Sequence, residues 1–145
     1  MKTKPSLVEH KVDTKLIIMA TWIAMMCLYL YCDICSLFRP GQIDSMVKGK
    51  MGFLDVSQMS LFWAGVLMAI PALMILVSPF AAAKTSRIIN LIVSPIYFLV
   101  NIGNLLGETW GYYYLFGLLE LGMVAFIFII SLRWPRQAQC GMVSG

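Results

Sequence analysis

The polar residues between positions 87 and 108 follow a helical spacing. They recur at intervals of three and four residues: Arg87, Asn90, Ser94, Tyr97, Asn101, Asn104 and Glu108. Residues at this spacing share one face of a helix, so the pattern predicts a helix with a single polar stripe. Nearly all residues between them are aliphatic, and an unpaired polar group in hydrocarbon costs several kcal/mol. We therefore expect the stripe to face other helices or a hydrated cavity.

Four long apolar runs divide the chain, at residues 16–38, 57–80, 88–106 and 112–134. Each is close to the roughly 20 residues that an α-helix needs to cross the hydrocarbon of a bilayer. Charged residues make up only 12% of the 145 residues, about half the fraction in a typical soluble domain. The runs also lack the alternation of membrane barrel strands. The sequence predicts a single all-α domain, an integral membrane four-helix bundle with up-down-up-down topology, and a disordered tail at residues 136–145.

The connections contain signals for helix starts, kinks and the membrane interface. Asp55 precedes the second run with Gln58 three residues later, which is the spacing of a capping box. Pro71 and Pro95 lie inside the second and third runs, where we expect kinks whose freed carbonyls find partners on neighbouring helices. Aromatic residues before and within the start of the fourth run predict an interfacial belt: Trp110, Tyr112, Tyr113 and Tyr114.

Lysine and arginine are unevenly distributed between the two sides of this bundle. The side with both termini carries eight, and the other side carries three, namely Arg39, Lys48 and Lys50. The positive-inside rule then predicts a cell (inner) membrane protein with both termini cytoplasmic. The net charge of +4 follows from topology and from attraction to anionic lipid headgroups. No nucleic acid partner is expected, because no basic run carries interleaved aromatic residues.

Further polar side chains gather in the outer half of the predicted bundle. At about 1.5 Å per residue, Asp33 and Asn101 lie about 8 Å, and Glu120 about 12 Å, from the outer ends of their helices. An intramembrane ionisable residue is a functional-site candidate, so we expect a ligand pocket. The alternative is a structural clamp in which a protonated Glu120 bonds an Asn or Tyr of another helix. The candidate ligand contacts are Asp33, Asn101, Asn104 and Glu120, with Tyr29, Tyr97 and Tyr113 as walls.

Two cysteines form a C-x-x-C motif at the outer end of the first run. Cys32 and Cys35 are the pair that a membrane thiol-disulfide oxidoreductase would use. Such enzymes need a second pair in an outer loop, whereas Cys27 lies mid-membrane and Cys140 in the tail. We therefore favour the interpretation that Cys32 and Cys35 serve as small apolar residues in an apolar helix. The single histidine, His10, leaves no predicted metal site, and no cofactor is expected.

Several short motifs in order resemble one family. They are Tyr31-x-Asp33-Ile34-x-Ser36, Arg39-Pro40-Gly41, Gly49-Lys50-Met51-Gly52, Ala69-Ile70-Pro71-Ala72-Leu73-Met74, Tyr113–Glu120 and Trp134-Pro135. From about Val12 to Arg136 the chain resembles an uncharacterised family of small prokaryotic four-helix membrane proteins, domain of unknown function 6326. The resemblance implies four spans and a bacterial or archaeal cell membrane, and it implies no activity.

The function predicted from these patterns is non-enzymatic. We expect the bundle to bind or pass a small polar or amphipathic ligand in its outer half, or to assist a membrane partner. One alternative is the thiol-disulfide oxidoreductase, and another is a structural or interaction subunit that packs through Gly103-x-x-x-Gly107. The expected partners are the lipid bilayer, a small-molecule ligand, and a second copy of the chain or another membrane protein.

Overall fold

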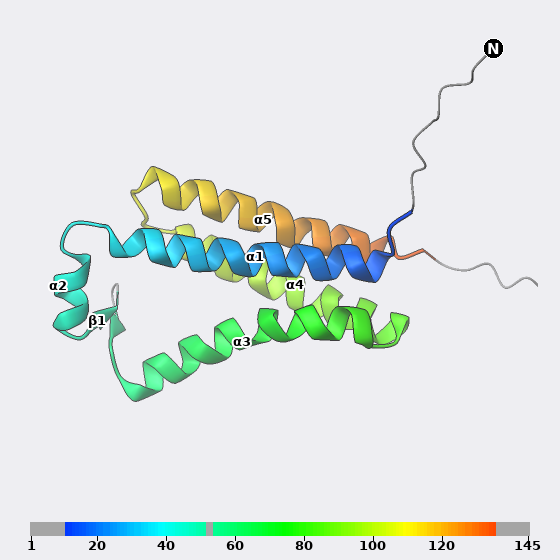
Figure 1. Cartoon of the computed structure of the whole chain (residues 1–145), viewed down its shortest axis with the longest axis horizontal. Coiled ribbons are helices and arrows are strands. Elements are labelled where there is room, and N and C mark those ends of the chain that lie inside the picture. The colour runs from blue at the N-terminus through cyan, green and yellow to red at the C-terminus, as the bar shows by residue number, and fades with distance from the viewer. Residues whose placement is uncertain (1–10, 52–53, 136–145) are drawn as a thin grey trace, which may run out of the picture.

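The computed structural model describes residues 11–51 and 54–135. Its principal elements are four long helices, with a short helix and a two-stranded hairpin between the first and the second of them (Figure 1). Each long helix is long and apolar enough to cross a membrane, so the predicted four-span helical fold is confirmed. The elements in chain order are α1 (Thr14–Leu37), α2 (Gln42–Val47), β1 (Lys50–Met51), β2 (Leu54–Asp55), α3 (Gln58–Phe80), α4 (Ala83–Leu105) and α5 (Gly111–Leu132).

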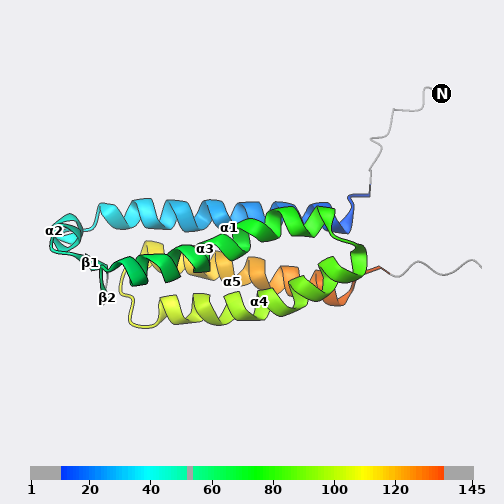
Figure 2. The same cartoon turned by 90° about the horizontal axis from the view of Figure 1, so that it is seen from below.

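The long helices run alternately up and down along one axis (Figures 1 and 2). Each packs on its neighbour in sequence and α5 closes the ring against α1. Among these pairs the contact between α4 and α5 is the most extensive, and that between α3 and α4 is the least. We call the end that holds Thr14 and Leu132 the terminal end, and the end that carries α2 and the hairpin the loop end.

The apolar core follows one face of α1. Five of its residues, from Ile18 to Cys32, recur every three or four positions and are buried, as a helix that turns one stripe inward requires. The Trp22 ring meets the edge of Tyr97 from α4, with centroids 6.1 Å apart. The buried core cluster consists of Ile18, Trp22, Met25, Tyr29, Met74, Tyr97, Val124 and Ile127.

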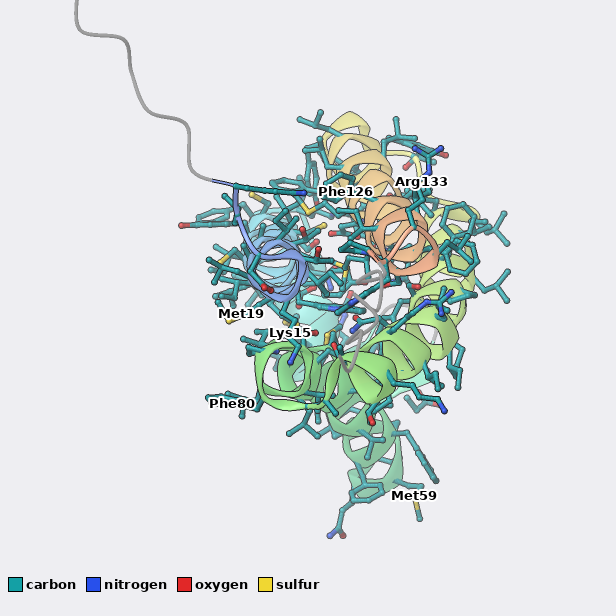
Figure 3. The ribbon with its side chains drawn as sticks, turned by 90° about the vertical axis from the view of Figure 1, so that its right-hand side faces the viewer. Lys15, Met19, Met59, Phe80, Phe126 and Arg133 are labelled. Atoms are coloured by element: carbon teal, nitrogen blue, oxygen red, sulfur yellow. The ribbon has the colours of Figure 1, made fainter. Side chains whose placement is uncertain are left out.

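Helix α3 diverges from the other helices towards the loop end. Figure 1 shows it bent near its middle, and in Figure 3, seen from the terminal end, Met59 lies well away from the other helices. No residue at positions 58–70 is buried, whereas Pro71, Met74 and Ser78 are. A proline inside a helix lacks an N–H and crowds the preceding turn, which bends the helix. The loop half of α3 is therefore loosely attached to the bundle.

Two helix starts differ from those predicted. Ser57, not Asp55, caps α3: its hydroxyl accepts from the Ser60 N–H at 3.1 Å, and Ser60 Oγ accepts from the Ser57 N–H at 2.8 Å. Asp55 is held in extended form by its pairing with Lys50 in the hairpin, so the helix begins after it. Helix α4 starts five residues before the predicted run, because charged residues in its first turns interrupt the apolar pattern without interrupting the helix.

Candidate functional site

The polar stripe of α4 faces the interior over most of its length, as its spacing predicts. Its loop end differs, because Asn104 is exposed and Glu108 lies beyond the end of the helix. Near the terminal end, Arg87 Nε donates to the Ser131 carbonyl at 3.0 Å. The stripe residues that are at most 1% exposed are Asn90, Ser94, Tyr97 and Asn101.

In the terminal half of the bundle, Asn90 joins three helices. Its Oδ1 accepts from Trp22 Nε1 of α1 at 2.8 Å. Its Nδ2 donates to the Ser86 carbonyl at 2.9 Å and to Ser78 Oγ of α3 at 3.3 Å. Ser94 Oγ donates to the Asn90 carbonyl at 2.6 Å. Both the oxygen and the nitrogen of the Asn90 side chain have partners, which is the arrangement of a structural clamp.

In the loop half, the layer around Asn101 is incompletely bonded. Tyr29 of α1 donates its hydroxyl to Asn101 Oδ1 at 2.6 Å. Among residues 11–51 and 54–135, Asn101 Nδ2 and Glu120 Oε1 are buried without a partner, as is Ser131 Oγ near the terminal end. Glu120 is only 6% exposed. Since buried polar groups in proteins are nearly always bonded, two such groups in one half of the bundle call for an explanation.

Tyr97 forms a hydrogen bond to a carbonyl of α3 that Pro71 leaves without a partner in its own helix. The Tyr97 hydroxyl donates to the Leu67 carbonyl. In a regular helix that carbonyl would accept from the N–H four residues later, but position 71 is a proline and has no N–H. The freed carbonyl thus finds a partner on α4, as expected for a proline inside a membrane helix. Tyr97 therefore holds α3 to α4 where their contact is otherwise small.

The predicted ligand contacts divide into an interior group and an exposed group. Tyr29 and Cys32 lie on the buried face of α1, and Glu120 is buried on α5, which packs against α1. Asp33 is exposed on α1, because it follows the buried Cys32 and points about 100° away from it around the helix.

The expected inward position of Asn104 is also corrected. Asn104 lies in the last turn of α4, where the diverging α3 leaves this face uncovered, and it is exposed. The structure thus places Tyr29, Asn101 and Glu120 inside the loop half of the bundle, and we call these three residues the Asn101 cluster. The ring of Tyr113 lies against the guanidinium of Arg39 instead. Tyr97 bonds to α3, and Asp33 and Asn104 lie outside the cluster.

Within the part of the chain that the structure describes, neither the cysteine pair nor the glycine pair makes a contact that supports its predicted role. Cys32 is buried and Cys35 is exposed, and both are free thiols. Gly103 and Gly107 are exposed, and a Cβ at either would meet no atom within 4 Å. The interaction face and the thiol chemistry stay predictions.

Arg39 joins the end of α1 to the connection between α4 and α5. Its two terminal nitrogens donate to the two carboxylate oxygens of Glu108 at 3.2 and 3.0 Å. Its Nε donates to the Tyr112 hydroxyl, which lies 3.0 Å from Ser36 Oγ. Such a two-pronged pair fixes orientation as well as distance. We call this group the Arg39 latch; it consists of Arg39, Glu108, Trp110, Tyr112 and Tyr113.

Aromatic rings surround the guanidinium of the Arg39 latch. The Arg39 Cζ lies 5.4 Å from the ring centroid of Trp110, 5.0 Å from that of Tyr112 and 5.2 Å from that of Tyr113. These distances are those of cation–π contacts. From the sequence alone, these aromatic residues predict an interfacial belt and Arg39 serves as an orientation signal. The sequence signal for their pairing is the opposite charge of Arg39 and Glu108, which lie just past the ends of α1 and α4 at the loop end.

The latch also changes the acidity of Glu108. Burial by itself would raise the pKa of its carboxyl, but hydrogen bonds from the Thr109 and Trp110 backbone N–H groups and from Arg39 stabilise the charged form more. The pKa of Glu108 is therefore lower than its ordinary value. Glu108 remains a carboxylate at neutral pH, and the latch is a closed ion pair.

Comparison with known proteins places the chain in one family. No curated protein and no solved structure matches it. The model of the family of unknown function DUF6326 matches residues 6–140, nearly the whole chain. The chain belongs to this family of unknown function, DUF6326.

Proposed function

We propose that this protein binds, or passes across the membrane, a small polar or amphipathic ligand at the Asn101 cluster. The observation that carries the proposal is the pair of buried, unpartnered polar atoms, Asn101 Nδ2 and Glu120 Oε1. Leaving a buried donor or acceptor unpaired costs about 1–3 kcal/mol for each group. A ligand that bonds both atoms recovers this cost, which makes the cluster a favourable place to bind.

The two atoms restrict the chemistry of the ligand. Asn101 Nδ2 is a donor and needs an acceptor from the ligand. The carboxyl oxygen of Glu120 accepts an O–H or N–H, and its charged form attracts a cation. Tyr29, which bonds Asn101, adds aromatic surface. A small hydroxylated or amino compound with an apolar part suits this set of groups.

The loop half of α3 is the element best suited to admit such a ligand. It contains no buried residue before Pro71, and its bond to α4 at this level is the hydrogen bond from Tyr97 to the Leu67 carbonyl. A helix bent at a proline has a natural hinge there. Movement of this segment would expose the Asn101 cluster without disturbing the well-packed contact between α4 and α5.

Orientation is part of the proposal. The excess of lysine and arginine at the terminal end supports a cytoplasmic location for that end. The Asn101 cluster would then lie in the outer half of a prokaryotic inner membrane and receive its ligand from outside the cell. The closed Arg39 latch would hold the external end of α1 against the connection between α4 and α5.

Cys32 provides a reporter for the cluster, because it is buried three residues after Tyr29 on the same face of α1. In a full-length variant that retains only this cysteine, we would measure modification rates with 2-aminoethyl methanethiosulfonate, a cation, and with its anionic 2-sulfonatoethyl analogue. The proposal predicts faster reaction with the cation, and Glu120→Gln should reduce the ratio of the two rates. A variant that retains only Cys35 is the matched control, since Cys35 is exposed and its rate ratio should not respond to Glu120→Gln.

Two outcomes would contradict a ligand-accessible cluster. If Cys32 reacts with neither reagent in a folded protein, small polar molecules do not reach this region. If Glu120→Gln leaves the rate ratio for Cys32 unchanged, the carboxyl does not govern which ligand enters. Either result would favour the structural clamp.

A further inference from the structure

A cavity of about 650 Å³ opens at the terminal end, far from the Asn101 cluster. It lies between the start of α1, the start of α4 and the residues that follow α5. Ile88 gives the cavity an apolar wall, and Trp134 also lines it. Tryptophan in a membrane protein typically marks the membrane–water boundary. The cavity is therefore at headgroup level.

The charges that line this cavity are mainly positive. Lys15, Lys84 and Arg87 contribute cations, and Asp13 contributes the one carboxylate among the lining residues. Asp13 is occupied as the N-cap of α1, where its Oδ1 accepts from the Lys15 N–H at 2.7 Å. Two positive charges thus remain in excess, in a cavity that is large enough for a phosphate and the atoms attached to it.

The cations retain donors that an anion can use. Lys15 Nζ donates to the carbonyls of Pro79 and Ala81 at 3.2 and 2.6 Å, and Figure 3 shows Lys15 at the end of α3. An ammonium has three N–H groups, so one remains. Arg87 uses Nε for its bond to α5, and its two terminal nitrogens donate to no other described residue. Lys84 makes no hydrogen bond or ion pair within the described part of the chain.

The start of α4 adds backbone donors on the same side of the cavity. Its N-cap, Ala82, has no side-chain oxygen to bond the first N–H groups. The first helical bond is from Ser86 N to the Ala82 carbonyl at 2.8 Å, so the N–H groups of the first turn lack helical partners. The positive end of the helix dipole reinforces the attraction of the side-chain cations for an anion.

We propose that this cavity binds a phosphate group, supplied by an anionic phospholipid of the adjacent leaflet. Basic cavities between membrane helices at headgroup level are suited to phosphorylated lipid headgroups. The apolar wall at Ile88 then faces the first carbons of the lipid, and the cations face the phosphate. The site does not depend on the ligand proposed for the Asn101 cluster.

Native mass spectrometry of the full-length protein in detergent tests this site. The probes are 1-palmitoyl-2-oleoyl phosphatidylglycerol and the corresponding phosphatidylcholine, titrated separately. We expect the anionic lipid to be retained preferentially. Lys84→Gln should weaken binding of the anionic lipid about fivefold. Removing Arg87 in addition should weaken it by a further factor of about five.

Arg133→Gln is the matched control, since Arg133 lies at the same end but does not line the cavity. It should leave retention of the anionic lipid unchanged. Lys84→Gln alone keeps the test valid if removal of Arg87 disturbs folding, and circular dichroism verifies the helix content of each variant. The site is refuted if Arg133→Gln weakens retention as much as Lys84→Gln does, or if the two lipids are retained equally.

Competition with inorganic phosphate distinguishes a phosphate group carried by a phospholipid from a free phosphate ion. If millimolar phosphate displaces the anionic lipid from the wild type, the cavity takes a free phosphate as well and the phosphate chemistry is supported. If it does not, the lipid backbone contributes to binding and the phospholipid is supported as the source.

Discussion

The hydrogen bond from Tyr97 to the Leu67 carbonyl leads to a prediction with a definite sign. Tyr97→Phe removes the hydroxyl, and the carbonyl that Pro71 has freed then loses its partner. Hydrogen bonds between membrane helices contribute about 0.6 kcal/mol on average and up to about 1.7 kcal/mol. A buried carbonyl left without a donor costs about 1–3 kcal/mol. We expect Tyr97→Phe to lower the free energy of unfolding by about 1–2 kcal/mol, a five- to thirtyfold change in the unfolding constant.

The same substitution should be nearly harmless when Pro71 is replaced by alanine. The new backbone N–H at position 71 can donate to the Leu67 carbonyl within α3, as in a regular helix. We therefore expect a coupling energy of about 1 kcal/mol between the two positions in a double-mutant cycle. Unfolding in mixed detergent micelles with increasing dodecyl sulfate, followed by far-UV circular dichroism, gives the four free energies.

Tyr29→Phe is the matched control for this cycle. Tyr29 is also buried and also donates its hydroxyl across helices, but its acceptor is Asn101 Oδ1 rather than a carbonyl freed by proline. Its cost should be the same with and without Pro71→Ala. Equal costs of Tyr97→Phe in the two backgrounds would refute the argument that proline creates the need for this tyrosine.

Three further predictions concern the latch, the helix packing and the topology. Because the pKa of Glu108 is lowered in the folded state, the latch stabilises the fold fully at pH values above the ordinary carboxyl pKa of 4.5. This contribution disappears as the pH falls through the lower pKa of the folded state. Unfolding midpoints measured against pH should show the loss in the wild type and not in Glu108→Gln. Gly117→Ala should destabilise by about 1 kcal/mol, because its Cβ would lie 2.5 Å from Leu105 Cδ2 of α4 and this leucine side chain would have to shift. Gly122→Ala should be neutral in the same unfolding assay, because a Cβ there meets no atom within 4 Å. Reporter fusions at Lys50 and after the last residue should give opposite compartments, with the latter cytoplasmic, and an external C-terminal reporter would reverse the orientation.

The number of spans and the internal stripe were predictable because lipid allows few alternatives. A chain that crosses hydrocarbon must satisfy its backbone within helices, so four apolar runs imply four helices. Polar side chains at helical spacing within them must turn inward, and Asn90 and Asn101 do so. This argument weakens at the membrane boundary, where water can satisfy polar groups. Asp33 and Asn104 lie near helix ends, and both are exposed.

Partners distant in sequence were not predictable from spacing. Pro71 indicated a freed carbonyl, but only the packing of α3 on α4 shows that Tyr97 bonds it. Arg39 and Glu108 are 69 residues apart, and their pairing depends on the antiparallel return of two helices to the loop end. The capping box at Ser57 was missed because the competing hairpin keeps Asp55 extended. In each case the local pattern was compatible with more than one partner, and tertiary contacts select among them.

The two polar layers along α4 differ in how completely they are bonded. Around Asn90 both side-chain atoms are bonded, so substitution there removes existing contacts between helices and should cost stability. Around Asn101 the Nδ2 atom and Glu120 Oε1 are unbonded, so they stabilise nothing in the free protein and their burial opposes folding. The cost is offset elsewhere, by the Arg39 latch and by the bond that Tyr97 makes to α3. A polar layer kept at a net cost is expected where a ligand completes the bonding, which is why we propose the site at Asn101 and Glu120 rather than at Asn90.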